Sequence, residues 1–157
     1  VQWAKKNNIK VGIFNLIGLP EETPADFNET LKMNQIIQPD WHATSIFFPY
    51  PGTELYKKAD AMGVLPPKLQ DRDERQLAVI DYPTFSKKQI QKSFDSFHYE
   101  VYKYNPNQKL WKKAIYLIQV FLGHNNLTKA KLVIIQLLYK LHLDGIAMKF
   151  GLFGGFQ

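Results

Sequence analysis

The feature that most constrains the fold is an alternation of short apolar runs with helix signals in residues 1–65. The run Lys10–Leu16 is apolar and ends in a Gly-Leu-Pro turn, as a buried strand does. A second run, Trp41–Phe48, is stopped by the sequence Pro-Tyr-Pro-Gly. A helical segment follows each run. This order of strand, helix, strand and helix predicts an α/β layer or barrel whose parallel strands are joined by helical crossovers.

Both of the expected helices carry cap signals. Thr23 is a typical N-cap residue with Pro24 at the first helical position, and this helix is expected to run to about Gln38. Thr53 begins a shorter helix, and Gly63 fits the left-handed position that closes it. Local cap signals therefore mark where each helix begins after its strand.

Two strand–helix units are too few for a complete fold of this kind. Two strands cannot form a sheet that is covered on both faces, and a complete βα barrel needs roughly 250 residues. We therefore expect residues 1–65 to be the carboxyl-terminal part of a larger, TIM-like βα barrel, in a fragment whose beginning lies upstream. Residues 66–85 contain paired prolines and a charged run, which predict a linker with a candidate short strand at Leu77–Ile80.

The character of the chain changes after the linker, and residues 86–157 predict an α-helical extension. Ser86 is the expected cap of a first helix. The apolar residues of this helix recur at intervals of four and three, the stripe of an amphipathic helix: Ile90, Phe94, Phe97, Val101 and Tyr104. Two further helices are expected over residues 110–122 and 128–143.

Positive charge is concentrated in this extension. Residues 1–85 carry nine basic and eleven acidic side chains, whereas residues 86–157 carry eleven lysines and three acidic residues. A solvated lysine face is the simplest interpretation, and contact with an anionic membrane surface is the other. Nucleic acid is not expected as a partner, because this half has no arginine for phosphate and guanine contacts. The run Leu132–Leu143 is well short of the roughly 20 apolar residues that span a bilayer, so we expect a cytoplasmic location with peripheral membrane contact.

The composition excludes several kinds of chemistry from this chain. The cysteine count is zero, which rules out disulfides, thiolate zinc sites, cysteine nucleophiles and cysteine-ligated iron–sulfur clusters here. The adjacent carboxylates of Glu21 and Glu22 are a weak candidate for acid–base chemistry. Four histidines show no metal-ligand spacing and are expected to be ordinary helix or strand residues: His42, His98, His124 and His142. We therefore expect no metal site within this chain.

The most informative stretch begins at Phe14 and reads Phe-Asn-Leu-Ile-Gly-Leu-Pro-Glu-Glu-Thr-Pro-Ala-Asp-Phe. It places a strand directly before a glycine turn, with a capped helix behind it. A Pro-Asp pair follows at Pro39, and the next strand ends in the sequence Pro-Tyr-Pro-Gly-Thr-Glu-Leu from Pro49 onward. In βα architectures ligands bind at the carboxyl ends of the strands, and a glycine there lets the backbone approach a flat ligand closely.

In their order and spacing these motifs resemble the radical S-adenosylmethionine (SAM) superfamily, and within it the cobalamin-binding branch. That branch commonly reads F-N-I-I-G-L-P-G-E-T-x-x-D/E at the fifth barrel strand and P-Y-P-G-T-x-L at the sixth. The resemblance covers residues 1–65 closely and 66–110 loosely, and the last forty residues match no family pattern. It implies an α/β fold, namely the last units of a radical SAM barrel followed by a helical extension.

The resemblance also implies roles for residues at the two strand ends. The segment Leu16–Leu19 would flank the adenine of SAM, Asn15 would face the barrel interior, and Glu22 would hold the loop and the start of the helix. The expected SAM-side residues are Asn15, Leu16, Ile17, Gly18, Leu19, Glu22, Phe48, Pro49 and Tyr50. Strand and turn packing alone is the alternative for these residues. Glu21 departs from the pattern, because the family usually has glycine there, and a positive φ at glutamate costs about 1 kcal/mol or more.

The activity implied by the resemblance is reductive cleavage of SAM at a 4Fe–4S cluster, which starts radical chemistry on an organic substrate. Members of this branch often use cobalamin as well, for methyl transfer or oxidative modification. The cluster ligands and a cobalamin domain are expected outside this chain, so the chain alone is expected to be inactive. The expected partners are a small-molecule or lipid-like substrate and an electron donor such as flavodoxin or ferredoxin.

Two other interpretations stay open. The basic helices suit a non-catalytic adaptor or a membrane-surface binding module, which predicts a monomer that binds anionic vesicles in a salt-sensitive way. Nucleic-acid modification by a radical SAM enzyme of the methylthiotransferase type shares the glycine turn. Such enzymes normally add a compact β domain after the barrel, and the helical extension predicted here argues against that type.

Overall fold

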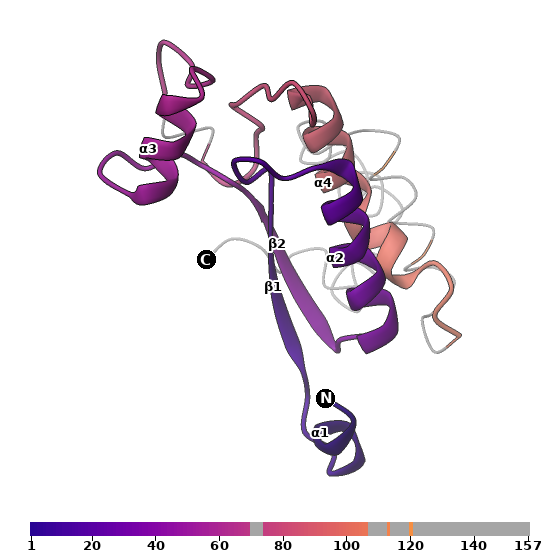
Figure 1. Cartoon of the computed structure of the whole chain (residues 1–157). Coiled ribbons are helices and arrows are strands. Elements are labelled where there is room, and N and C mark those ends of the chain that lie inside the picture. The colour runs from indigo at the N-terminus through magenta and orange to yellow at the C-terminus, as the bar shows by residue number, and fades with distance from the viewer. Residues whose placement is uncertain (70–73, 107–112, 114–119, 121–157) are drawn as a thin grey trace, which may run out of the picture.

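The computed structural model describes residues 1–69 and 74–106, together with residues 113 and 120. It is a mixed α/β structure with two strands, β1 (Gly12–Ile17) and β2 (Trp41–Ile46). Its helices are α1 (Gln2–Lys6), α2 (Pro24–Ile37), α3 (Glu54–Ala61) and α4 (Lys87–Tyr102). The order of strand, helix, strand and helix predicted from the sequence is confirmed (Figure 1). Apart from residues 113 and 120, the helices expected over 110–122 and 128–143 lie outside the described residues.

Local signals set both ends of α2. The Thr23 hydroxyl accepts a hydrogen bond from the Asp26 N–H at 3.3 Å, and the Asp26 carboxylate accepts one from the Thr23 N–H at 2.9 Å. This capping box satisfies N–H groups that a first helical turn leaves without partners. At the other end Gln38 adopts the left-handed conformation, and the Lys5 amine donates to the carbonyls of Ile37 and Gln38 at 2.5 and 2.6 Å. The helix therefore begins and ends where the sequence predicts.

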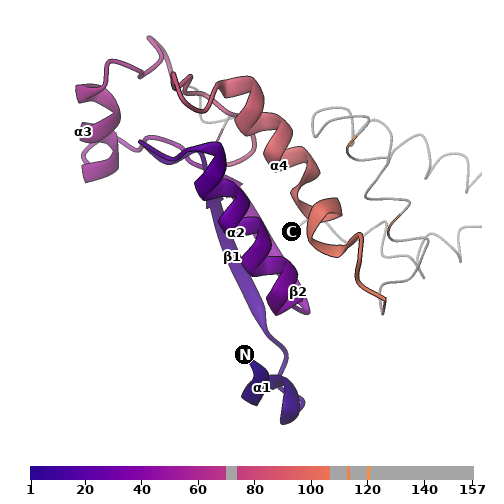
Figure 2. The same ribbon diagram turned by 45° about the vertical axis from the view of Figure 1, so that its right-hand side comes forward.

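The two strands are parallel and run in register from Gly12 opposite Trp41 to Ile17 opposite Ile46. Helices α2 and α4 lie on the same side of this sheet and pack against each other (Figures 1 and 2). Helix α3 lies beyond the carboxyl ends of the strands and α1 beyond their amino ends. The described part of the chain contributes two strands to the sheet, so the larger barrel stays a prediction.

The two faces of the sheet differ in how they are covered. Because side chains alternate along a strand, Asn15 and Ile17 point toward the helices and are buried. Phe14 and Leu16 point the other way and are 80% and 42% exposed. On that side the indole of Trp41 packs edge-on against Phe14, with ring centroids 5.3 Å apart. We call this second side the open face, formed by Gly12, Phe14, Leu16, Trp41, Ala43 and Ser45.

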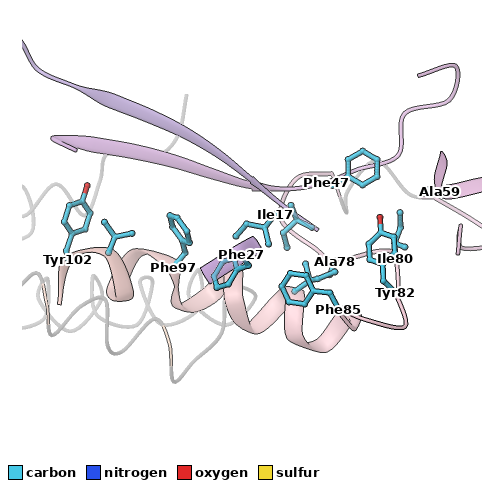
Figure 3. Close-up of a cluster of buried hydrophobic side chains, with 13 residues drawn as sticks. Ile17, Phe27, Phe47, Ala59, Ala78, Ile80, Tyr82, Phe85, Phe97 and Tyr102 are labelled. Atoms are coloured by element: carbon cyan, nitrogen blue, oxygen red, sulfur yellow. The ribbon is translucent and has the colours of Figure 1, made fainter. Parts of the chain in front are cut away.

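The hydrophobic core lies between the sheet and α4, with Tyr102 at one end and Ala59 at the other (Figure 3). Segment 74–85, which was expected to be part of a linker, contributes four buried side chains to this core: Ala78, Ile80, Tyr82 and Phe85. Residues after the second strand–helix unit thus pack together with the first unit rather than apart from it.

The short strand predicted at Leu77–Ile80 is wrong, because a side chain of α4 takes the place of a neighbouring strand. The Gln91 Oε1 atom accepts a hydrogen bond from the Ala78 N–H at 3.0 Å, and Gln91 Nε2 donates to the Gln76 carbonyl at 3.3 Å. The Ala78 N–H and the Gln76 carbonyl therefore find partners without a β ladder.

Helix α4 carries the predicted apolar stripe on its packed side: Ile90, Phe94, Phe97 and Val101. The prediction for Tyr104 is wrong, since this residue is 80% exposed. The helix ends at Tyr102, so helical spacing does not apply two residues later. Tyr102 is buried instead, and its hydroxyl donates to the Pro39 carbonyl at 3.0 Å. Over residues 1–69 and 74–106 no helix combines the length and the apolar character that crossing a bilayer requires.

Candidate functional site

Strand β1 ends in a turn that Glu22 closes from within. The Glu22 carboxylate accepts hydrogen bonds from the N–H groups of Gly18 and Leu19, at 2.5 and 2.9 Å. Gly18 has a φ of 82°, which L-residues rarely adopt, and a Cβ atom there would lie 3.1 Å from Cγ2 of Ile90 on α4. The glycine thus serves both the left-handed backbone and the close approach of α4. Glu22 holds the loop, and the start of α2 is capped by Thr23 and Asp26.

Negative charge is disfavoured in this turn. Burial raises the pKa of Glu22, and the hydrogen bonds from the two backbone N–H groups oppose that rise only in part. The Tyr82 hydroxyl is buried without a hydrogen-bond partner, and burial together with the charge of Glu22 raises the pKa of Tyr82 above its usual range. Because both N–H groups that the carboxylate binds belong to the backbone of the turn, the Glu22 carboxylate is placed to position that backbone.

Glu21 occupies a left-handed position, with a φ of 70°. The family usually has glycine at this position, and the backbone here does have the positive φ that favours glycine. A non-glycine residue in this conformation costs about 1–2 kcal/mol of strain. The Glu21 carboxylate forms an ion pair with Lys58 of α3 at 2.5 Å, but both side chains are exposed and such pairs contribute little. The turn keeps a glycine-type backbone with a residue that strains it.

The chain that leaves β2 places two aromatic rings beside the end of β1. The Phe47 N–H donates to the Ile17 carbonyl at 2.7 Å, which extends the strand pairing by one residue. Phe48 is buried and Tyr50 is 40% exposed, and their rings lie edge to face with centroids 5.1 Å apart. The Thr53 hydroxyl donates to the Tyr50 carbonyl at 2.8 Å, which fixes the loop before α3.

Residues 74 and 75 join this exit from a distant part of the sequence. The Ile46 N–H donates to the Arg75 carbonyl at 2.9 Å. Arg75 Nε pairs with Glu74 Oε1 at 2.8 Å, and the same carboxylate oxygen accepts a hydrogen bond from the Tyr50 hydroxyl. The Tyr50 ring is thereby tied to the segment that follows the strand.

A groove of about 320 Å³ lies at the carboxyl ends of the strands, where the open face meets this exit. We call it the strand-end groove. Its lining residues are Leu16, Ser45, Ile46, Phe47, Phe48, Tyr50, Thr53, Leu55 and Arg75. Arg75 is the one charged residue among these described lining residues. A mostly apolar groove with a few polar groups at its rim fits a flat, largely apolar ligand.

Three of the nine expected SAM-side residues meet in this groove, namely Leu16, Phe48 and Tyr50. The other six lie in the core or in the turn. Ile17 and Pro49 are fully buried, and Leu19 packs against the core. The backbone N–H of Gly18 donates to the side chain of Glu22, so these two residues shape the turn rather than line the groove.

The orientation expected for Asn15 is wrong. Its side chain points to α2, where Asn34 Nδ2 donates to Asn15 Oδ1 at 2.8 Å, and both amides are buried. In a βα barrel the interior is the face turned away from the helices. Asn15 is one residue from Leu16, and alternation along the strand places the two on opposite faces. The amide pair therefore fastens α2 to β1.

Six lining residues of the groove were not among the expected SAM-side residues: Ser45, Ile46, Phe47, Thr53, Leu55 and Arg75. Ser45 lies opposite Leu16 in the parallel register, so it becomes visible once the pairing of the strands is known. Arg75 has no local signal, because it reaches the groove only through its backbone hydrogen bond with Ile46. Among the residues described, no three histidine, aspartate or glutamate side chains gather in a way that could hold a metal ion.

Comparisons with known proteins do not assign a family or a function to this chain. No protein-family model matches the chain, and a search of curated proteins finds no significant match. The function is therefore argued from the motifs and from the geometry at the strand ends.

Proposed function

We propose that this chain forms the carboxyl-terminal part of a radical SAM enzyme, and that the strand-end groove contributes one wall of the SAM site. The observation that carries the proposal is the meeting of Leu16, Phe48 and Tyr50 in one groove at the carboxyl ends of two parallel strands. These residues come from the two motifs that resemble the family. Ligands of βα folds bind at this edge.

The groove suits the adenine part of SAM. Its walls are apolar, and the Phe48 and Tyr50 rings stand edge to face at 5.1 Å, so a flat heterocycle finds both a ring face and a ring edge there. Ser45 and Tyr50 bring hydroxyl groups for the polar edge of the base. The guanidinium of Arg75 stands at the rim.

The chain does not supply the iron–sulfur cluster, because it contains no cysteine. We propose that the three cluster cysteines, and a cobalamin domain where the enzyme uses one, belong to parts of the protein outside this chain. When bound, SAM together with a reduced 4Fe–4S cluster would supply the radical chemistry that acts on the substrate. The residues of this chain bind and orient the nucleoside, and the apolar open face keeps water from one side of the chamber.

The clamp at the glycine turn has a defined part in this proposal. Glu22 occupies the N–H groups of Gly18 and Leu19, so these groups are not offered to a ligand. Its contribution is to fix the end of β1 and hence the position of Leu16 in the groove. The substrate in this proposal is an organic small molecule or lipid-like compound, the reaction is methyl transfer or oxidative modification, and the electron donor is a flavodoxin or ferredoxin. The location that goes with it is cytoplasmic, with peripheral membrane contact.

The experiment uses the native protein that contains this chain, purified without oxygen and reconstituted with iron and sulfide. With SAM and dithionite we expect formation of 5′-deoxyadenosine, measured by chromatography. Tyr50→Ala removes one wall of the groove and should raise KM for SAM by roughly tenfold, since base–aromatic stacking is worth about 1–3 kcal/mol. Tyr104→Ala, at an exposed tyrosine outside the groove, is the matched control.

Three results would contradict the proposal or a part of it. A native protein that binds no iron–sulfur cluster and forms no 5′-deoxyadenosine removes the activity. A Tyr50→Ala variant with an unchanged KM for SAM removes the groove from the SAM site even if the activity is present. Cleavage of SAM by the 157-residue chain alone would contradict the placement of the cluster ligands outside it.

A further inference from the structure

A second groove lies against the first turns of α4 and shares no lining residue with the strand-end groove. Its volume is about 750 Å³, within the range of roughly 300–1,000 Å³ that is usual for small-ligand sites. Segment 77–79 contributes Leu77, Ala78 and Val79, which form an apolar floor. The α4 side contributes three lysines: Lys87, Lys88 and Lys92. We call this the lysine groove.

The three lysines stand where a helix disfavours positive charge. Lys87 and Lys88 occupy the first two positions of α4, and its first turn contains no acidic residue. The amino end of a helix carries partial positive charge, so cations there are unfavourable. Lys88 and Lys92 are four residues apart and therefore neighbours on one face, an arrangement of like charges that also destabilises a helix.

The acidic residues that line the lysine groove are engaged elsewhere. An Asp81 carboxylate oxygen accepts a hydrogen bond from the Lys87 backbone N–H at 2.7 Å, and an Asp95 oxygen accepts one from Gln91 Nε2 at 3.2 Å. None of the ion pairs found among the described residues involves Lys87, Lys88 or Lys92. The lining thus holds three lysines against two carboxylates, which leaves a net positive charge beside an apolar floor.

The other two capped helices follow the local charge rules that α4 breaks. Helix α2 has Asp26 in its first turn, and α3 has Glu54 there. On α2 Lys32 pairs with Glu29, and on α3 Lys57 pairs with Glu54, each at 2.6 Å. A local rule that is kept elsewhere and broken beside a groove points to a site at which the missing negative charge comes from a partner.

We propose that the lysine groove binds a single-chain anionic lipid, with the acyl chain on Leu77, Ala78 and Val79 and the anionic head group at Lys88 and Lys92. The apolar floor favours a chain, which a free phosphate lacks. The lysines favour an anionic head group, which distinguishes the ligand from a neutral lipid. A lipid held in the groove also reverses the two unfavourable charge arrangements at the start of α4. This site is independent of the SAM groove and of the activity proposed for it.

The test measures binding of three ligands with the same twelve-carbon chain to the native protein that contains this chain, by titration calorimetry at concentrations where the ligands are monomeric. Dodecanoate is expected to bind with one ligand per chain. Dodecanol is expected to bind at least roughly tenfold more weakly, since each lysine near an anionic group is worth about 1 kcal/mol. Dodecylammonium is expected to show no binding.

Variants separate the rim from the floor. The double substitution Lys88→Gln and Lys92→Gln should reduce the affinity for dodecanoate to that for dodecanol. The matched control is Lys57→Gln and Lys58→Gln on α3, which changes the net charge equally and should leave the affinity unchanged. Val79→Phe fills the floor and should abolish binding of both ligands. If circular dichroism shows that this variant is unfolded, Leu77→Asp provides the same test by charging the floor.

Several outcomes would overturn the assignment. Equal affinity for dodecanol and dodecanoate removes the role of the lysines, and unchanged affinity in the Lys88, Lys92 double variant does the same. Displacement of dodecanoate by millimolar inorganic phosphate shows an ion site without a chain. Displacement by an acidic peptide that binds more tightly than dodecanoate reassigns the groove to a protein partner.

Discussion

The two ends of the sheet differ in how their polar groups find hydrogen-bond partners. At the carboxyl end the N–H groups of Gly18 and Leu19 are both satisfied by Glu22. At the amino end two buried polar atoms, Oε1 of Gln38 and Nε2 of His42, have no hydrogen-bond partner. The amino end also has the larger cavity, about 860 Å³ against 320 Å³. Cavity size therefore does not show which end has the better-satisfied backbone. The smaller groove adjoins the turn in which Glu22 satisfies two backbone N–H groups, although the Tyr82 hydroxyl near that turn is buried without a partner.

The state of His42 explains much of the difference. Its ring packs against Phe97, His98 and Tyr102 of α4, with centroids 5.3, 4.3 and 5.4 Å away. Nδ1 is 3.1 Å from the Thr44 hydroxyl. Burial lowers the pKa of His42 to about 4, so the ring is neutral and packs as an aromatic residue. The histidine pair escaped the sequence analysis because the two rings come from β2 and α4, and spacing within one element cannot show that.

The largest effect that would sharpen the comparison is expected at Gly18. Gly18→Ala meets two costs, the left-handed backbone at roughly 1–2 kcal/mol and the contact with Ile90 at roughly 1–3 kcal/mol. Gly63→Ala is the matched control, because Gly63 has a φ of 66° but open space around the missing Cβ. Urea denaturation should show the free energy of unfolding reduced by roughly 2–5 kcal/mol in the first variant and about 1–2 kcal/mol in the second. Equal losses would mean that α4 does not press on the turn.

A smaller effect of opposite sign is expected at the amino end. His42→Phe removes the unpaired Nε2 atom and keeps a ring against Phe97 and Tyr102, so at pH 7 we expect stabilisation by about 1 kcal/mol. Thermal unfolding of the two proteins measures this. A loss of stability larger than that of Thr44→Val would show that the imidazole makes a polar contact that matters, which would erase the difference between the ends.

The same variant changes the acid side of the stability profile. Because the folded pKa of about 4 lies below the ordinary 6.5, the contribution of neutral His42 is complete above pH 6.5 and is lost as the pH falls toward 4. His98 and Tyr102 on α4 and Thr44 on β2 face the ring, and Lys5, Lys10 and Asp40 line the adjacent cavity. His42→Phe should flatten the profile over this window.

The contrast also separates what the sequence can predict from what it cannot. The caps at Thr23 and Ser86, the glycine turn and the order of the elements were predicted correctly, because each depends on residues within a few positions of one another. Two features were predicted wrongly: the direction of the Asn15 side chain, which points toward α2, and the strand at Leu77–Ile80. Each depends on a partner on another element. Asn34 decides the first and Gln91 the second.

The candidate site divides in the same way. Leu16, Phe48 and Tyr50 are within reach of sequence reasoning because their motifs end two strands that must be parallel. Arg75 is not, since only the hydrogen bond from Ile46 brings it to the rim. The sequence could thus indicate which edge of the sheet holds the groove, but not which residues of later segments complete it.

The last prediction concerns Glu22 and tests whether its carboxylate holds the turn at the carboxyl end of the sheet. Burial raises the pKa of Glu22 above its ordinary 4.5, so the folded state binds its proton more readily than the unfolded state. The stability that this group contributes is present in full below pH 4.5 and is lost as the pH rises through the higher folded value.

Glu22→Gln keeps an acceptor for the Gly18 and Leu19 N–H groups and cannot ionise, so its unfolding free energy should vary less between pH 4.5 and 7. Glu22→Ala removes the acceptor and should lose stability at every pH, by about 1–3 kcal/mol for an N–H group left buried and unpaired. If the Ala and Gln variants have the same free energy of unfolding, the Glu22 carboxylate does not hold the turn. The carboxyl end of the sheet would then have no advantage over the amino end.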